Sequence, residues 1–407
     1  MNIWLCNPFD NLVEEGARPQ RYALLAAEFA RRGHAVTWWT SDFSHARKAR
    51  RAAADGTPLP HAYANAQGVF MRLVATPPYT RNVSLRRVRS HRAFARAWQR
   101  EALVAVAAKE LARPDILVTS LPPLATHAAA LALRDAFACR LVVDVQDAWP
   151  EAFAGLLPFP APLRRLVQRL LFGPAREAAR RAYLTADRIT AVSGTYLATA
   201  RDYGADAPMA AFRLGIADVA KDADPVAQGP VRLVYGGNMG ASYDLATLVR
   251  AVRALDAEAP GSVRLDLAGT GPTEASLRRL AAGCGAIVFH GFLRRPEYEA
   301  LLRQGEIGVV PMFARSCVAV PNKLADYAAA GLAALSCLPG ETEKLIAADN
   351  AGVTYRAGDV PGLADAIRSM ASDRDKLLAM RRNALARARK EFLAANIYPE
   401  LCDFILA

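Results

Sequence analysis

Residues 231–255 read VRLVYGGNMGASYDLATLVRAVRAL, and this stretch decides the fold. The apolar run 231–235 predicts a buried strand, and three glycines follow it within five residues. From about residue 245 to 255 apolar side chains return at helical spacing. A strand, a glycine loop and a helix in this order indicate an α/β fold, in which helices cover a parallel sheet.

The same alternation extends in both directions along the chain. Residues 2–7, 18–32 and 35–40 predict a strand, a helix that stops at Gly33, and a second strand. Further strands are expected at 69–74, 116–119, 141–145 and 189–192, and after residue 255 at 263–267, 287–289, 307–310, 333–336 and 352–355. We therefore predict two Rossmann-like domains, residues 1–214 and 215–389, joined by a linker at 215–230 and followed by a helix at about 390–407 that packs back on the first domain.

The positive charge lies in the first half of the chain. The formal net charge is +12, and residues 1–200 hold 27 basic and 15 acidic side chains, whereas residues 201–407 hold 24 of each. Residues 43–100 alone hold 12 basic side chains and a single acid, Asp55. A hydrophobic content of 53% with 22% charged residues excludes disordered, collagen-like and coiled-coil chains.

The start of the chain and its apolar runs bear on the expected location. Residues 1–10, MNIWLCNPFD, have no basic region followed by an apolar one, as a secretory signal would. The longest apolar runs are much shorter than the roughly 18–20 residues that span a bilayer. We therefore expect a cytoplasmic protein, with its six cysteines reduced and mostly buried.

A second informative stretch is GVVPMFARSCVAVPNKLADYAAAGLAAL, residues 308–335. It predicts a strand, a loop, and a helix from about Asn322 that Gly331 ends. Lys323 and Asp326 lie three residues apart on one side of the first turns. The helix start and the lysine suit a diphosphate, and the carboxylate suits the two hydroxyls of a ribose. The alternative is a capped surface helix in which Lys323 and Asp326 form an ion pair.

The segment PNKLADYAAAGL, residues 321–332, resembles the signature of retaining nucleotide-sugar glycosyltransferases of glycosyltransferase family 4, in particular bacterial members that build O-antigen and capsule. The family motif reads E-x7-E followed by an alanine-glycine pair. Asp326 falls on the second glutamate, whereas Val318 falls on the first, so that acid is absent.

Five further segments resemble the family in the family's order: residues 31–45, 142–153, 234–248, 267–272 and 286–302. The resemblance implies the GT-B architecture, in which two Rossmann-like domains face each other across a cleft. The first domain would bind the acceptor and the second the nucleotide-sugar. In such α/β sheets ligands lie beyond the carboxyl ends of the strands.

The resemblance also implies a donor site. The family holds the phosphates with an arginine and a lysine after the first strand of the second domain, and both are absent after Tyr235. We therefore expect Lys323 to neutralise most of the phosphate charge, and the glycines to let the backbone approach the diphosphate. The expected donor-binding residues are Gly236, Gly237, Asn238, Met239, Gly240, Gly269, Gly271, Phe292, Leu293, Pro321, Asn322, Lys323 and Asp326.

On the acceptor side the resemblance points to Glu15, Gly16 and Arg18, in the loop after the first strand, and to Asp147. Asp147, Lys323 and Asp326 are the expected catalytic residues. Asp147 would orient the acceptor or stabilise the transition state; the alternative is that it caps a helix that begins at 149–151. His127 lies in an alanine-rich helix, where we expect a structural role.

The family mechanism implies front-face attack with retention, in which the leaving diphosphate accepts the acceptor proton. No metal and no cofactor is expected, because Asp222-Ala223-Asp224 lies in the linker and not after a buried strand. The preferred donor is a UDP-N-acetylhexosamine or a deoxy relative. The alternatives are a nucleotide-sugar 2-epimerase of the same fold and a catalytically inactive scaffold.

Arg89, Arg92, Arg96 and Arg100 are spaced to lie on one face of a helix. Residues 156–172 combine leucine and phenylalanine with three arginines. Such faces suit an anionic membrane surface or the phosphates of a lipid-linked acceptor, and predict a peripheral protein on the inner face of the cytoplasmic membrane. The alternative is a solvated arginine face. A nucleic-acid partner is not expected, because no base-reading motif accompanies the charge.

Overall fold

The computed structural model describes residues 1–154, 161–223 and 229–407, with only the backbone at 153–154 and 161–171. It divides into two compact units. The first unit comprises Met1–Gly215 and Ile397–Ala407, and the second comprises Ile216–Asn396.

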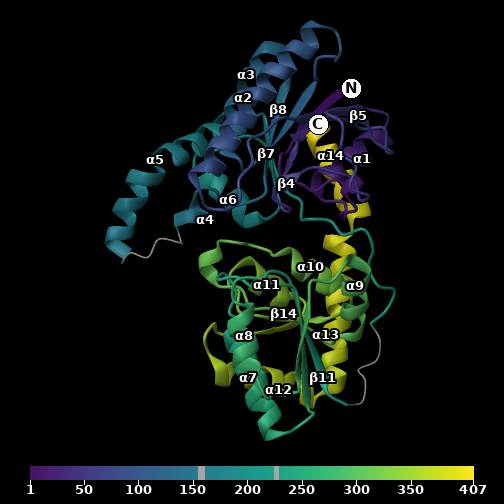
Figure 1. Ribbon diagram of the computed structural model, residues 1–407, viewed down its shortest axis with the longest axis vertical. Coiled ribbons are helices and arrows are strands. Elements are labelled where there is room, and N and C mark those ends of the chain that lie inside the picture. The colour runs from purple at the N-terminus through teal and green to yellow at the C-terminus, as the bar shows by residue number, and fades with distance from the viewer. Residues whose placement is uncertain (155–160, 224–228) are drawn as a thin grey trace. The chain divides into compact units, whose positions relative to one another are not determined.

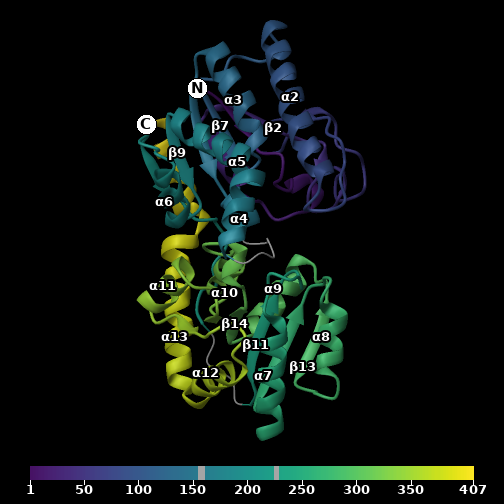
Figure 2. The same ribbon diagram turned by 90° about the vertical axis from the view of Figure 1, so that its left-hand side faces the viewer.

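An eight-stranded sheet forms the centre of the first unit, with the strand order β10-β9-β8-β7-β1-β2-β6-β5 (Figures 1 and 2). The edge strand β5 is antiparallel to β6, and all other neighbours in this sheet are parallel. The strands are β1 (Asn2–Cys6), β2 (Ala35–Ser41), β5 (Ala62–Ala64), β6 (Phe70–Val74), β7 (Ile116–Leu121), β8 (Arg140–Val145), β9 (Arg188–Ala191) and β10 (Met209–Ala211); β3 (Phe43–Ser44) and β4 (Ala49–Arg50) form a separate hairpin.

Helices cover this sheet and bury its apolar side chains. The core between the sheet, α2 and α3 contains Trp4, Trp39, Phe94 and Trp98, each at most 1% exposed. Aromatic side chains of this size contribute most of the area that such a core buries. The helices are α1 (Arg21–Arg31), α2 (Leu85–Ala107), α3 (Leu124–Phe137), α4 (Glu151–Ala154), α5 (Ala161–Thr185), α6 (Gly194–Asp202) and α14 (Ala394–Leu406), with a 3-10 turn at Val13–Glu15.

The second unit has a six-stranded, fully parallel sheet in the order β13-β12-β11-β14-β15-β16. Its strands are β11 (Val231–Gly236), β12 (Val263–Ala268), β13 (Ile287–Gly291), β14 (Ile307–Val310), β15 (Ala333–Ser336) and β16 (Gly352–Thr354). Its helices are α7 (Leu245–Glu258), α8 (Glu274–Ala281), α9 (Arg295–Gln304), α10 (Asn322–Ala329), α11 (Glu341–Ala348), α12 (Val360–Ser372) and α13 (Arg374–Arg387), with a 3-10 turn at Ala314–Ser316 and a π-helical turn at Ala388–Phe392.

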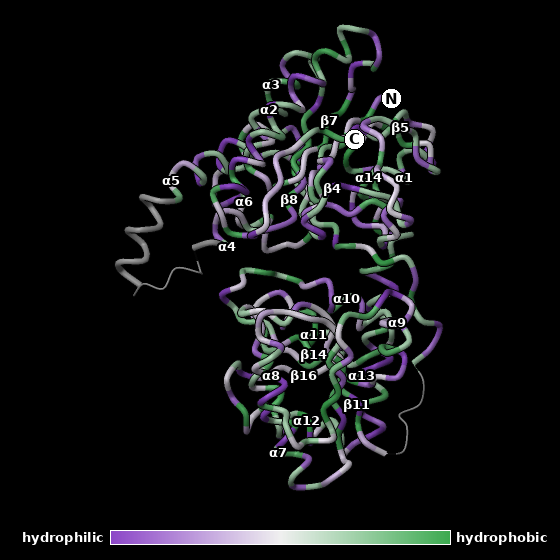
Figure 3. Tube along the Cα trace, viewed as in Figure 1, coloured by the Kyte–Doolittle hydropathy of each residue, from purple (hydrophilic) through white to green (hydrophobic). Residues whose placement is uncertain are grey.

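Each face of this second sheet has its own core. Helices α7, α8 and α12 contribute to a cluster on one face, and α9, α10 and α11 contribute to a cluster on the other. Figure 3 shows hydrophobic and hydrophilic residues alternating along the helices, as expected for helices with one buried face. The predicted fold class, an α/β chain with two Rossmann-like halves, is confirmed.

Two details differ from the sequence prediction. The short strands β3, β4, β5 and β10 were not expected, because two or three residues carry too little hydrophobic periodicity. Part of the predicted linker is bound to the second unit: the Ile216 amide donates to the Phe392 carbonyl and the Ala220 amide to the Ala329 carbonyl, both at 2.8 Å. The first aspartate of the Asp-x-Asp segment, Asp222, is exposed, and Asp224 lies outside the described residues.

Candidate active site

A pocket of about 520 Å³ opens in the second unit beyond the carboxyl ends of β11, β12 and β13 and beside the start of α10. Parallel α/β sheets bind their ligands at this edge. Nine of the predicted donor-binding residues line the pocket, together with three that were not predicted. The lining residues are Gly236, Gly237, Asn238, Ala268, Gly269, Thr270, Phe292, Leu293, Tyr298, Asn322, Lys323 and Asp326.

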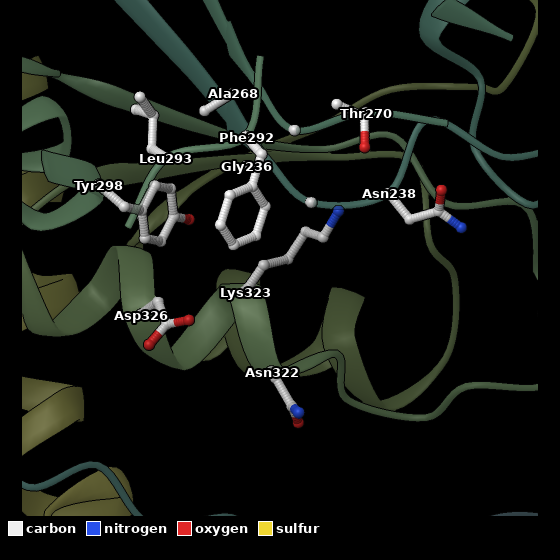
Figure 4. A pocket seen from close by; sticks show the side chains of 12 residues that line it. Gly236, Asn238, Ala268, Thr270, Phe292, Leu293, Tyr298, Asn322, Lys323 and Asp326 are labelled. Carbon is white, nitrogen blue, oxygen red and sulfur yellow. The ribbon is translucent and has the colours of Figure 1, made fainter. Parts of the chain in front are cut away.

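Lys323 is a buried cation that points into this pocket. Figure 4 shows its side chain extending from α10 toward the glycine loop. The residue is 8% exposed, and its Nζ atom has no hydrogen-bond partner among the described residues. Nζ lies 4.0 Å from the centroid of the Tyr235 ring and 4.1 Å from that of Tyr243. The electron-rich ring faces compensate only part of the lost hydration.

Burial lowers the pKa of Lys323 to about 7. A buried ammonium without a carboxylate partner is unfavourable, so the neutral form of the lysine becomes more populated. An anion bound in the pocket would supply the missing partner and restore the charge. The Lys323–Asp326 ion pair that a surface helix would form does not occur.

Asp326 binds a different cation. The Arg295 guanidinium donates from an NH atom to Asp326 Oδ1 at 3.3 Å and forms an ion pair with Glu299 as well. Asp326 keeps 14% of its side-chain surface exposed and lies near Tyr298 on the pocket wall (Figure 4). The arginine fixes the carboxylate at the pocket edge, where it can accept hydrogen bonds from ligand hydroxyls.

Neighbouring protein atoms leave no room for a side chain at several glycines of this site. A Cβ on Gly269, whose φ is +127°, would lie 1.9 Å from the Gly237 carbonyl oxygen, and one on Gly236 would lie 2.3 Å from the Tyr298 hydroxyl. A Cβ on Gly271 would lie 2.5 Å from Met239 O. The prediction attributed Gly236, Gly237 and Gly240 to close approach of a diphosphate; at Gly236 the Tyr298 ring already excludes a side chain, whereas a Cβ on Gly237 would meet Lys323 Nζ at 3.4 Å.

Four predicted donor residues do not line the pocket. Met239 is fully buried in the core below the loop, and its carbonyl accepts from the Thr273 amide at 3.0 Å. Gly240 and Gly271 pack against Asn238 and support that loop. Pro321 precedes α10 at its N-cap position, and its carbonyl accepts from the Leu324 amide. These residues shape the site without forming its surface.

Tyr298, Thr270 and Ala268 line the pocket but were not predicted. Tyr298 lies on α9, one turn after the helix start, and no motif marks it. Thr270 stands between the two glycines of the loop after β12, so the glycine pair was a usable signal for it. Tyr327 also contributes from below: its hydroxyl accepts a hydrogen bond from the Gly236 amide at 2.9 Å.

In the first unit, the three residues expected in the loop after β1 are held by protein partners. The Glu15 carboxylate forms an ion pair with Arg51 at 2.8 Å, and both side chains are fully buried. Gly16 has a φ of +70° and ends the 3-10 turn. Arg18 donates to the Gly215 carbonyl at 3.2 Å. The Glu15 side chain is therefore held inside the unit by Arg51, whereas the Arg18 side chain stays partly exposed.

Asp147 follows β8 and is held by its two neighbours. Its carboxylate accepts from the Ala148 amide at 2.9 Å and from the Trp149 indole at 3.2 Å. Burial raises the pKa of Asp147, and these hydrogen bonds and the charge of Arg87 oppose that rise. His127 is buried in α3, where its Nε2 atom lies 3.0 Å from the Thr185 hydroxyl, which is a structural contact.

Arg89, Arg92, Arg96 and Arg100 all lie on α2 and are exposed. The side chains of Arg164, Arg165 and Arg169, in the second basic segment, lie outside the described residues. Within the described chain, no helix is long and apolar enough to cross a membrane. The described histidine, cysteine and acidic side chains include no cluster that could hold a metal ion.

Two family models match the chain. Residues 19–215 match "Glycosyl transferase 4-like domain", and residues 230–373 match "Glycosyl transferases group 1". No curated protein sequence matches.

Solved structures resemble the chain over nearly its whole length. Sucrose-phosphate synthase of Thermosynechococcus elongatus is 15% identical, with a TM-score of 0.73 and coverage of 99% of this chain and 97% of that one. Anabaena HepE in complex with UDP-glucose is 14% identical, with a TM-score of 0.65 and coverage of 99% and 98%. A trehalose-phosphate synthase of Burkholderia xenovorans with glucose-6-phosphate is 15% identical, with a TM-score of 0.65 and full coverage of both chains.

At these identities the solved structures establish the fold, and the two consecutive family models identify the domains. The chain is a glycosyltransferase of the GT-B fold, with a glycosyl transferase 4-like domain followed by a group 1 domain.

Proposed function

We propose that the protein transfers a sugar from a UDP-sugar to an acceptor with retention of the anomeric configuration. The observation that carries this proposal is the buried ammonium of Lys323, which has no hydrogen-bond partner among the described residues and faces the pocket. A diphosphate is the ligand that such a cation and the adjacent helix start favour. Complexes of Anabaena HepE with UDP-glucose and with UDP support the same donor class.

Different residues of the pocket would contact different parts of the donor. Lys323 would contact the diphosphate, Asp326 the ribose hydroxyls, and the backbone near Phe292 and Leu293 the base edge. In the reaction the bond from the sugar C1 to the diphosphate oxygen breaks and a bond to the acceptor oxygen forms, while the diphosphate accepts the acceptor proton. Lys323 would stabilise the charge that develops on the leaving group.

For Asp147 we propose the acceptor-orienting role. Its two hydrogen bonds fix the carboxylate after β8, at the sheet edge where ligands of α/β domains bind. In D147N we expect kcat to fall by about a hundredfold, while the KM of the donor stays within threefold of wild type. A variant with wild-type kcat would exclude the role and leave only the local hydrogen bonds.

The preferred acceptor is a lipid-linked saccharide of bacterial surface polysaccharide synthesis, and the preferred donor is a UDP-N-acetylhexosamine or a deoxy relative. At the start of α2, Val83, Leu85 and Val88 are 69%, 88% and 44% exposed, next to the exposed arginines of the same helix. A cavity of about 830 Å³ lies among α2, α3 and α5, and its mainly apolar lining includes Arg92 and Arg96. These features suit an anionic, partly apolar partner.

Membrane attachment is tested by flotation with liposomes. We expect the protein to float with vesicles that contain phosphatidylglycerol but not with pure phosphatidylcholine. The double variant L85S/V88S should bind these vesicles at least about tenfold more weakly, because two exposed apolar side chains no longer insert. Equal binding of the variant, or no flotation with either vesicle, would exclude this membrane surface.

The donor is tested by thermal denaturation with UDP-, GDP- and dTDP-sugars. We expect UDP-sugars alone to raise the melting temperature, because only a ligand of the folded state stabilises it. Product that forms only when an acceptor is added would exclude the 2-epimerase. A chain that no nucleotide-sugar stabilises would be the inactive scaffold, an alternative that the valine at position 318 favours.

A further inference from the structure

Two cations of the first unit that sequence analysis did not single out converge on one residue. Lys48, from the turn after β3, donates from Nζ to the Asn82 side-chain oxygen at 2.6 Å. Arg87, from the first turn of α2, donates to the Asn82 backbone carbonyl at 2.7 Å. Both cations are partly exposed to solvent. Asn82 thus accepts hydrogen bonds from both cations and brings them close together.

Aromatic rings and two histidines contact these two cations. The Arg87 guanidinium lies 4.9 Å from the centroid of the Trp149 ring and 5.6 Å from that of Phe9. Its Nε atom donates to His91 Nε2 at 3.3 Å, and Lys48 Nζ lies 3.2 Å from His45 Nδ1. Phe9 follows β1 and Trp149 follows β8, so the group lies at the carboxyl ends of the strands, where ligands of α/β sheets bind.

The two positive charges lack a carboxylate partner at ion-pair distance within the described part of the chain. Burial lowers the pKa of Arg87, and Tyr79 and then Asp147 oppose that fall. Burial, then repulsion by Arg87, lowers the pKa of Lys48 to about 8. Burial, then Lys48 and Arg87, lowers the pKa of His45 to about 4, which keeps that ring neutral.

The backbone at Lys48 is also unusual. Its φ is +55°, in the left-handed region that residues other than glycine, asparagine and aspartate seldom adopt. The turn that contains it connects β3 to β4, and from there the lysine side chain reaches Asn82. Backbone strain of this kind is concentrated at ligand sites.

We propose that Lys48 and Arg87, joined through Asn82, bind a phosphate or diphosphate group of the acceptor. The inference rests on the proposed function, because it assigns the charged part of the acceptor of that reaction. An anion placed between the two cations would replace their mutual repulsion with two charge-assisted hydrogen bonds. Asn82 and the rings would keep both donors oriented before the ligand arrives.

The test uses the full chain with its donor pocket filled by saturating UDP, so that added phosphates cannot enter there. Inorganic pyrophosphate, glucose 1-phosphate and farnesyl diphosphate are titrated by calorimetry. K48M and R87Q remove the two cations. Their matched controls are K109M, an exposed lysine with a φ of +60°, and R86Q, the exposed neighbour on α2.

We expect K48M and R87Q each to weaken binding of the phosphates at least about tenfold, and K109M and R86Q to bind within twofold of wild type. Tighter binding of farnesyl diphosphate than of pyrophosphate would identify a lipid as the source of the phosphate. Tightest binding of glucose 1-phosphate would identify a soluble sugar phosphate as its source. Equal binding by all variants, or an equal loss in R86Q, would overturn the site.

Two measurements keep this test independent of folding and of the donor. Unchanged affinity for UDP in K48M and R87Q shows that the variants are folded. If wild type does not bind UDP, the proposed donor is wrong, and the same titrations in a K323M background still test the phosphate site. A change in the fluorescence of Trp149, lost in W149F, locates the bound anion beside Arg87.

Discussion

The Nζ atom of Lys323 lies 4.0 Å from the centre of the Tyr235 ring, and with no described hydrogen-bond partner it is held by ring faces alone. A surface lysine would be hydrated, and a structural buried lysine would pair with a carboxylate. This arrangement costs stability in the empty protein and leaves a full set of ammonium donors for a ligand.

The first prediction concerns the opposite effects of replacing this lysine. In K323M, methionine fills the space without a charge, so the empty protein should gain about 1–3 kcal/mol of unfolding free energy. Affinity for UDP and turnover should fall at least about a hundredfold, because the diphosphate loses its main cation. Urea denaturation and calorimetry measure the two effects. The control is K344M, an exposed lysine of the same unit. Turnover within threefold of wild type would remove Lys323 from the site.

The second prediction is a pH dependence of donor binding. The pKa of Lys323 is about 7 in the empty site, and the cation is the form that binds. Affinity for a UDP-sugar, whose phosphates do not titrate in this range, should be constant below pH 6 and fall by up to about tenfold per pH unit above 7. Calorimetry from pH 5.5 to 9 tests this, and K323M should show a flat profile. A flat wild-type profile would contradict the assignment.

The same pKa has a consequence for stability. Between about pH 7 and 10.5 the unfolded lysine holds its proton and the folded one does not, so the unfolded state binds more protons. The contribution of Lys323 to stability of the empty protein therefore improves as pH rises through that window. The difference between wild type and K323M should shrink accordingly.

The third prediction tests the ribose role of Asp326. In D326A we expect affinity for UDP to fall by about tenfold or more, because hydroxyl-to-carboxylate hydrogen bonds are lost. Affinity for 2′,3′-dideoxy-UDP should change less than threefold, since that nucleotide has no hydroxyls to lose. D375A, an exposed acid of the second unit, is the control. Equal losses for both nucleotides would mean that Asp326 holds Arg295 and the pocket wall in place and does not contact the ribose.

The fourth prediction separates loop packing from ligand contact. G269A places a Cβ 1.9 Å from the Gly237 carbonyl, at a φ of +127°. We expect it to lower the unfolding free energy by about 2 kcal/mol or more even without ligand. G285A, where a Cβ meets nothing within 4 Å, should stay within about 0.5 kcal/mol of wild type. If G269A loses donor binding at full stability, the glycine serves the ligand after all.

The fifth prediction concerns the ion pair between Glu15 and Arg51, both fully buried. E15Q removes the carboxylate that pairs with the buried Arg51 and should cost about 3–5 kcal/mol of stability. The acceptor KM of the protein that remains folded should match wild type, because the carboxylate faces the core. Thermal denaturation and kinetics at 15 °C measure both, with E14Q as the control. A KM effect at full stability would return Glu15 to the acceptor site.

Much of the fold and of the donor pocket could be predicted from sequence. The periodicity of residues 231–255 marked β11 and α7, and the spacing of Lys323 and Asp326 on the first turns of a helix marked one pocket wall. These signals are local: a few consecutive residues carry both the structure and the chemistry.

The remainder depends on residues far apart in the chain. Arg295 meets Asp326 across 31 positions, and Lys48 meets Asn82 across 34, so no short pattern reveals either pair. The reason for Gly269 was also hidden, because the atom that excludes its side chain belongs to the loop after a different strand. Sequence spacing indicated where the backbone turns tightly, and only the folded chain shows which atom makes the turn necessary.

The division of the chain between its two units affects how the protein is made. The first unit includes Ile397–Ala407, and Leu401, Cys402 and Ile405 of this segment are fully buried. A ribosome that has translated residue 215 has therefore not yet supplied all of that unit. Residues 216–396 are synthesised before the missing segment, so the first unit cannot complete its core until the rest of the chain has been made.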